Sequence, residues 1–120
     1  MSVVDGVPEN APGSMNPGSL AGNNVTLRHG PSLYSVYAHL QPASIRVKIG
    51  DVVEQGAVVG LCGNSGNSSE PHLHFQMQDG PAFDESWGIE PVFRRVLLTR
   101  NGSTARIDEY TFRQGDMVEP

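Results

Sequence analysis

The stretch NVTLRHGPSLYSVYAHL, residues 24–40, alternates between two sets of side chains on either side of a Gly-Pro-Ser break. A period of two is typical of β-strands, whose successive side chains point to opposite faces of a sheet. The Gly-Pro-Ser break is a turn sequence that joins the two runs. The stretch therefore predicts an antiparallel hairpin, with His39 on the face opposite to Val36 and Ala38.

Strand and turn patterns continue to the end of the chain. Three short apolar runs at 45–49, 52–53 and 57–61 are separated by Gly-Asp and Gln-Gly turns, and HLHFQMQ at 72–78 alternates again. A second hairpin is expected around Asn101-Gly102, a dipeptide typical of tight hairpin turns. The 14 glycines and 9 prolines disfavour long helices. The sequence therefore predicts an all-β fold with mostly antiparallel strands.

Length, charge and cysteine content exclude several classes of protein. With 120 residues and a net charge of −5, the chain has no basic face for phosphates, so nucleic acid is not an expected partner. Its single cysteine, Cys62, excludes an internal disulfide and is expected to be a small buried side chain. No apolar run is long enough to span a membrane. The first residues lack the cationic start and apolar core of an export signal.

The chain is expected to form one domain over residues 1–120. Its first part, through residue 23, is rich in Gly, Pro, Asn and Ser over 6–23, which predicts a long exposed loop. The core is expected over 24–80. An extension with a hairpin follows over 81–120, in which Trp87 is expected to fill a core.

Two of the four histidines form a His-x-His pair, His72 and His74. On a strand this spacing places both imidazoles on one face, about 6–7 Å apart. That separation suits one metal ligand beside a proton-transfer group, or two ligands of one ion. If the strands that carry them lie in one sheet, His39 joins the pair on a polar surface. His29, next to a turn, is expected to be structural.

Four short motifs follow one another along the chain: Tyr-Ala-His-Leu at 37–40, Gly-Asp-x-Val at 50–53, Gly-Asn-Ser-Gly at 63–66 and Pro-His-Leu-His-Phe at 71–75. This ordered combination resembles the lysostaphin-type zinc endopeptidases, a family of peptidoglycan-hydrolysing metallopeptidases. The resemblance covers about half of the chain, from Gly22 to Gly80. It implies the antiparallel sheet or sandwich of that family, the duplicated hybrid motif, without its N-terminal strands.

The resemblance also implies a role for each histidine of the predicted cluster. In that family, zinc is held by the His and Asp of an upstream His-x-x-x-Asp motif and by the second His of His-x-His, here His74. His72 and His39 would be catalytic: they would orient or deprotonate the attacking water and stabilise the oxyanion. The substrate groove is expected to include Tyr37, which shares the predicted His39 face, together with Asn64 and Ser65.

The His-x-x-x-Asp motif is absent from this sequence. Four residues after the histidines stand Leu33, Ala43, Gln76 and Gln78. The spacing of Asp5 and Asp51 supports neither as a substitute. We therefore expect weak zinc binding or none, and a chain that is inactive on its own. An active site of this kind would cut peptide cross-links of peptidoglycan, a substrate outside the cytoplasm, although no export signal is expected here.

Two other functions are alternatives to this one, and the same observations also predict an assembly. A non-catalytic module would bind the cell wall, or regulate other wall hydrolases, through the degenerate groove. A biotinyl or lipoyl carrier is disfavoured, because Lys48, the only lysine, lies at a strand end and not at a hairpin tip. Missing N-terminal strands would leave a sheet edge with unpaired backbone groups. A homodimer formed by strand pairing or domain swapping is therefore expected to cover that edge.

Overall fold

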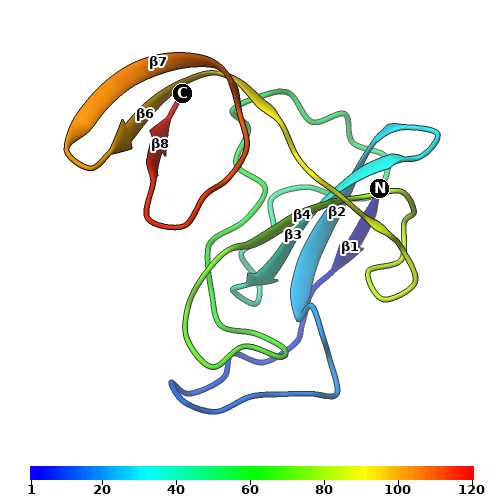
Figure 1. Cartoon of the computed structure of the whole chain (residues 1–120). Coiled ribbons are helices and arrows are strands. Elements are labelled where there is room, and N and C mark those ends of the chain that lie inside the picture. Colours follow the sequence, from blue (N-terminus) through cyan, green and yellow to red (C-terminus); the bar gives the residue numbers. More distant parts are fainter. The chain divides into compact units, whose positions relative to one another are not determined.

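The computed structural model describes all 120 residues, and the predicted all-β class is confirmed: the chain folds into eight strands and no helix (Figure 1). Contacts divide it into two compact units, Met1–Ile89 and Glu90–Pro120. The boundary between the two units lies inside residues 81–120, which the sequence predicts to be an extension of a single domain. No helix in the structure has the length and apolarity to cross a membrane.

The first unit contains a five-stranded antiparallel sheet in the order β1-β2-β3-β4-β5. Its strands are β1 (Ser2–Val4), β2 (Asn23–Gly30), β3 (Leu33–Leu40), β4 (His74–Gln78) and β5 (Gly88–Ile89). The hairpin predicted at 24–40 is confirmed as β2 and β3. In Figure 1 the long strands β2 and β3 lie side by side at the centre of this sheet.

The register of β3 against β4 decides which side chains share a face. Ala38 stands opposite His74, and Tyr37 stands opposite Phe75. Directly paired residues of an antiparallel sheet point to the same side. His74 therefore shares a face with Ala38, which is fully buried in an apolar cluster with Val36 and Ala21.

The apolar runs predicted between 45 and 61 do not form strands. Turns at Lys48–Asp51 and Glu54–Ala57 interrupt them, and a backbone hydrogen bond from Arg46 to Val59 joins the two limbs. Val52 is 92% exposed, and none of the apolar side chains over 45–61 is fully buried. The expectation that Cys62 is buried is wrong, because its isolated bridge to Leu40 leaves the thiol exposed.

The loop predicted at 6–23 is irregular, and it is fastened to the loop at 64–69. The side-chain amide of Asn10 donates to the carbonyls of Gly66 (2.6 Å) and Ser68 (3.0 Å). The two loops also touch where Gly22 meets Gly66, since a Cβ added to Gly66 would lie 2.3 Å from the Gly22 nitrogen. The 6–23 segment therefore supports the loop that leads to the histidine strand.

The core prediction for Trp87 is wrong, because its side chain is 81% exposed. Its backbone N–H donates to the carboxylate of Asp79 (2.8 Å), and its carbonyl accepts from the Asp79 N–H (3.1 Å). These bonds close a loop that leaves the indole in solvent. Phe83, inside the same loop, packs against the Val36–Ala38 cluster instead.

The second unit contains a three-stranded sheet in the order β7-β6-β8. Its strands are β6 (Phe93–Arg100), β7 (Ser103–Tyr110) and β8 (Met117–Glu119). The hairpin predicted at Asn101-Gly102 is confirmed, and both turn residues have positive φ (50° and 77°), as a tight mirror-image turn requires. Its core consists of Val96, Leu98 and Tyr110.

Candidate metal centre

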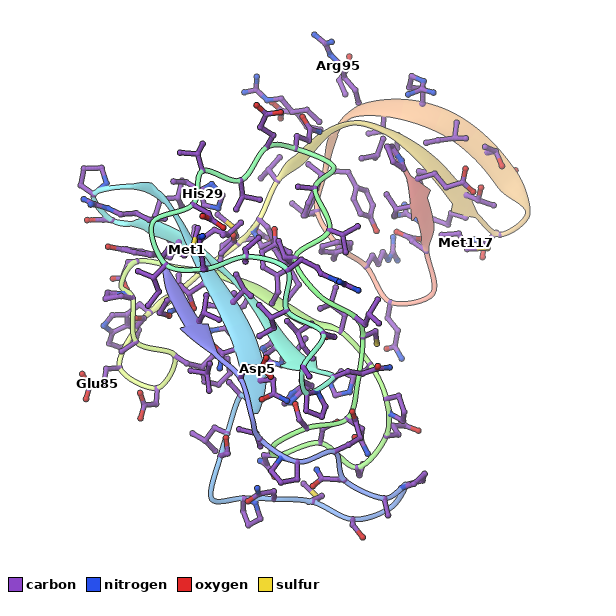
Figure 2. The ribbon with its side chains drawn as sticks, turned by 180° about the vertical axis from the view of Figure 1, so that it is seen from behind. Met1, Asp5, His29, Glu85, Arg95 and Met117 are labelled. Carbon is purple, nitrogen blue, oxygen red and sulfur yellow. The ribbon has the colours of Figure 1, made fainter.

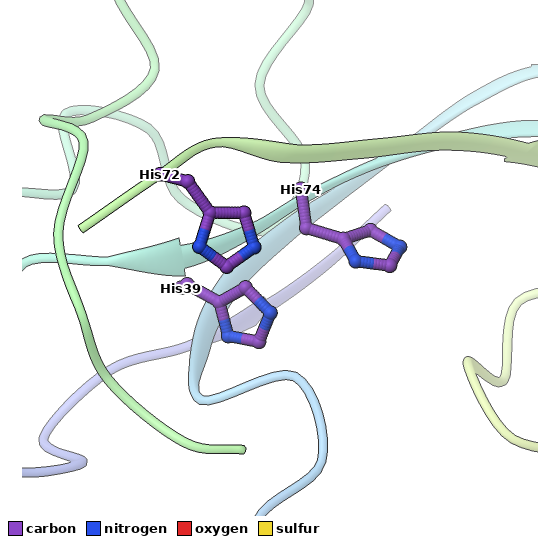
Figure 3. A group of neighbouring side chains, drawn as sticks. All are labelled: His39, His72 and His74. Carbon is purple, nitrogen blue, oxygen red and sulfur yellow. The ribbon is translucent and has the colours of Figure 1, made fainter. Parts of the chain in front are cut away.

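The structure brings His39, His72 and His74 together (Figure 3). Each offers one ring nitrogen, and these three atoms lie within 4.8 Å of one another. The ring of His39 lies 4.8 Å from that of His72 and 5.6 Å from that of His74, centroid to centroid. His39 is buried, His74 is partly buried and His72 is exposed, so the cluster opens to solvent on the His72 side.

His39 reaches the cluster through an irregular backbone. Regular alternation would place it with Tyr37, on the face away from His74. Its φ of 61° lies in the left-handed region, which breaks the alternation at the end of β3. The His39 N–H then donates to the carbonyl of Ala21 (2.9 Å) instead of to a neighbouring strand. The prediction that the histidines meet on the Tyr37 face is therefore wrong; they meet on the Ala38 side.

Backbone carbonyls determine which nitrogen of His39 and His72 is protonated. The Nδ1 of His39 lies 2.8 Å from the carbonyl oxygen of Ser65, and the Nδ1 of His72 lies 2.9 Å from that of Glu70. A carbonyl oxygen only accepts, so each Nδ1 must carry the hydrogen. In the neutral rings, both Nε2 atoms are therefore unprotonated.

The environment of His39 favours the neutral form of its ring. Burial lowers the pKa of His39 below its ordinary value, and the nearby His72 and His74 lower it further, while the bond to Ser65 opposes the shift. A neutral imidazole with a hydrogen on Nδ1 presents a lone pair at Nε2. The Nε2 of His39 can therefore accept a hydrogen or bind a metal ion.

The Nε2 of His74 lies 2.8 Å from the side-chain oxygen of Gln76. The amide nitrogen of Gln76 in turn donates to the side-chain oxygen of Gln78. Phe83 packs edge-on against the imidazole, with ring centroids 5.5 Å apart. In the sequence, Gln76 and Gln78 stand four residues after His72 and His74, where the His-x-x-x-Asp motif requires an aspartate. Their spacing of two and four from His74 is the pattern that would have placed them on its face.

The predicted groove residues occupy different places. Ser65 is fully buried: its carbonyl holds His39, and its hydroxyl donates to the Leu40 carbonyl (2.7 Å). Asn64 is also buried, and its side-chain oxygen has no hydrogen-bond partner. The structure does not bring Tyr37 to the cluster, because its ring packs against Phe75 on the other face of the sheet.

The remaining titratable candidates lie outside the cluster. His29 shares a hydrogen bond with the Ser35 hydroxyl (2.7 Å). Together with Met1 it lines a surface cavity, and the two residues lie near each other in Figure 2. The carboxylate of Asp5 accepts from the backbone of Ala43, and that of Asp51 accepts from the backbone of Lys48. No aspartate or glutamate belongs to the histidine cluster.

The donor set of the cluster fits a zinc ion. Imidazole nitrogen is a ligand that zinc prefers, and two of the three rings have an unprotonated nitrogen fixed by a backbone carbonyl. Partners of this kind on the second nitrogen are the usual way in which metal-binding histidines are oriented. The site lacks an anionic ligand, so its affinity is expected to be lower than that of a His–Asp–His set.

Comparison with known proteins adds an independent finding. Residues 5–85 match the profile of Peptidase family M23. The chain is 43% identical over 77 residues to an uncharacterised metalloprotease of Buchnera aphidicola, a match that covers 64% of this chain and 19% of that protein. It is 42% identical over 57 residues to the peptidoglycan DD-endopeptidase ShyA of Vibrio cholerae, covering 48% and 13%.

A third relative is the cell division protein DipM of Caulobacter vibrioides, 37% identical over 79 residues, with 66% of this chain and 12% of that protein covered. The chain thus matches between 12% and 19% of the length of these three curated relatives.

Proposed function

Because the chain belongs to peptidase family M23, we propose that it carries the histidine part of a zinc endopeptidase site directed at the peptide cross-links of peptidoglycan. The observation that carries this proposal is the convergence of His39, His72 and His74. One relative, ShyA of Vibrio cholerae, is a peptidoglycan DD-endopeptidase, and this supports the choice of substrate.

In this proposal His74 is the metal ligand, and His39 and His72 are catalytic. A zinc ion held at the site would lower the pKa of water to about 7 and polarise the scissile carbonyl. The unprotonated Nε2 of His72, at the open side of the cluster, accepts a proton from the attacking water. Once protonated, the same nitrogen donates to the leaving amine.

His39 supports the reaction from the buried side. Its Nδ1–H is held by the Ser65 carbonyl, so only Nε2 is free to face the reacting atoms. There it orients the attacking water by accepting a hydrogen bond. If His39 rather than His72 takes the proton of the attacking water, the resulting cation stabilises the oxyanion.

On its own, the chain is proposed to be inactive, because His74 is its only ligand of the family's set and no carboxylate joins the cluster. The test is digestion of purified peptidoglycan with the zinc-loaded chain, followed by mass spectrometry of the cross-linked fragments. Zinc binding without loss of cross-links agrees with this account. Zinc-dependent turnover by the chain alone would contradict it.

The absence of a carboxylate also favours a second candidate, a non-catalytic module that binds the cell wall or regulates wall hydrolases through the same groove. This module would sediment with insoluble peptidoglycan equally well with and without a chelator. Sedimentation that requires zinc supports the metallopeptidase site instead.

We further propose a homodimer that covers the outer edge of the first sheet. The edge strand β1 pairs only with β2, which leaves its other side without a partner strand. Unpaired edges readily accept a strand from a second molecule. Size-exclusion chromatography with light scattering tests this, and a monomer at all concentrations would refute it.

A further inference from the structure

The buried end of β4 carries two glutamines in line with His74. The side chains of residues 74, 76 and 78 share one face of the strand, since they are spaced by two. Their partners across the sheet are Ala38, Val36 and Tyr34, in that order. Gln78 is fully buried, although an apolar side chain would be easier to accommodate beside Val36.

The orientation of the Gln78 amide is determined by the loop that follows β4. Its Nε2 donates to the carbonyl of Gly80 (2.8 Å) and to that of Ala82 (3.2 Å). Both carbonyl oxygens only accept, so the amide nitrogen must occupy this position. The side-chain oxygen of Gln78 consequently faces the other way, toward Gln76.

The orientation of Gln76 follows from that of Gln78. The oxygen of Gln78 lies 2.6 Å from the amide nitrogen of Gln76 and requires a donor there. The oxygen of Gln76 is then turned toward the Nε2 of His74, at 2.8 Å. Because this oxygen only accepts, Nε2 of His74 must carry the hydrogen.

We propose that Gln76 and Gln78 are positioning residues that fix the tautomer of His74, so that Nδ1 is the nitrogen open to the metal ion. His39 and His72 instead present Nε2, because carbonyls hold their Nδ1 atoms. The inference rests on the proposed role of His74 as the metal ligand. It adds that two glutamine side chains and the backbone carbonyls of Gly80 and Ala82 orient this ligand.

The tautomer is measured directly by ¹⁵N NMR of the histidine rings in the metal-free chain, at a pH where the rings are neutral. The shifts distinguish a protonated from an unprotonated ring nitrogen. The wild-type His74 is expected to carry its hydrogen on Nε2. In Gln76→Leu this preference is expected to give way to a mixture of tautomers, while Gln76→Glu, which keeps an acceptor beside His74, retains it.

Gln78→Leu provides the sharper variant, because Gln78 does not touch His74 and acts only through Gln76. If burial of the leucine prevents folding, Gln76→Leu alone still decides the question. Gln55→Leu, an exposed glutamine of the same unit, is the matched control and should leave the ring unchanged. A hydrogen on Nδ1 of His74 in the wild type, or the same tautomer in Gln76→Leu, would overturn the inference.

Zinc affinity supplies the second readout, measured by competition with a chromophoric chelator. Loss of the glutamine contact is expected to weaken zinc binding by about 10- to 100-fold, the usual effect of removing such a partner. An affinity unchanged in Gln76→Leu would also overturn the inference. Because the tautomer is read without metal, absence of zinc binding in the wild type would refute the proposed function separately.

Discussion

Ser65 supports the site through its backbone and the sheet through its side chain. Its carbonyl accepts the Nδ1–H of His39, and its hydroxyl accepts the N–H of Asn23 (3.0 Å) while donating to Leu40. The Leu40 carbonyl also accepts from the side-chain amide of Asn23, so it keeps a donor without the Ser65 hydroxyl. The side chain that accepts from the Asn23 N–H is that of Ser65. The two functions of Ser65 can therefore be separated by a single substitution.

Ser65→Ala is expected to lower the free energy of unfolding by about 1–3 kcal/mol, because it leaves the buried Asn23 N–H without an acceptor. Zinc binding should persist, since the carbonyl that holds His39 remains. Urea unfolding and zinc titration of the same variant test both statements. Unchanged stability, or zinc binding lost with full stability retained, would contradict the assignment.

The residue scale also shows what sequence reasoning can and cannot reach. The shared face of His72 and His74 was predictable, because strand spacing requires only a period of two. The way in which His39 joins them was not, since it depends on a left-handed φ at His39 that leaves no mark on the pattern. The tautomers depend on carbonyls of Ser65 and Glu70, which the sequence does not place.

At the scale of elements, the loop at 64–69 is held in place by backbone-to-backbone packing. Gly66 has a φ of 78°, and a Cβ added there would lie 2.3 Å from the Gly22 nitrogen and 2.5 Å from the Ser19 carbonyl oxygen. The loops must therefore separate if this glycine is replaced. Gly56, with a φ of 87°, has nothing within 4 Å of the same added atom.

Comparison of Gly66→Ala with Gly56→Ala isolates the packing from the backbone strain. Both variants bear the left-handed penalty of about 1–2 kcal/mol, but only Gly66→Ala should also displace the loop before His72. Thermal unfolding should show the larger loss for Gly66→Ala, accompanied by weaker zinc binding. Equal losses in the two variants would mean that the contact with Gly22 contributes nothing.

In the second unit, strand β8 is fastened by the carboxylate of Asp116. Arg100 donates two hydrogen bonds of 2.7 Å to it, and the Tyr110 hydroxyl donates a third of 2.8 Å. The bonds from Arg100, and then that from Tyr110, lower the pKa of Asp116 from 3.8 to about 2. Folding thus favours the ionised carboxylate.

The sign of the resulting pH dependence follows from this shift. The stabilisation by Asp116 is complete well above pH 3.8 and is lost as the pH falls toward about 2. Asp116→Asn should be less stable than wild type at neutral pH, and the difference should shrink over that acidic range. This difference in stability is measured by urea unfolding of the whole chain, monitored through the NMR signals of β6 and β7. A difference independent of pH would contradict the assigned role.

At the scale of the whole molecule, local patterns accounted for the long hairpins and failed for the short strands. The pairs β2–β3 and β6–β7 follow from alternation and turn chemistry within one stretch. Strands β1, β5 and β8 have two or three residues each, too few for a period to be visible, and exist because a neighbour pairs with them. The division at residue 89 reflects contacts, and the sequence marks it only by a shift in charge, since five of the eight basic residues follow it.

Family membership and the structure agree on one centre in this chain, the three histidines. Membership in family M23 rests on residues 5–85, which contain all three. The second unit lies outside that match, and its ion-pair cluster has a structural explanation in Asp116. The proposed function therefore depends on whether the histidine cluster holds a metal ion.

The measurement that tests this most directly is a calorimetric titration of the metal-free chain with zinc, with two histidine variants beside it. We expect weak binding of about one zinc per chain in the wild type and no binding in His74→Ala. His29→Ala, whose histidine bonds to Ser35 outside the cluster, should bind zinc as the wild type does. Absence of binding in the wild type, or equal binding in His74→Ala, would contradict the assignment of a zinc site to this cluster.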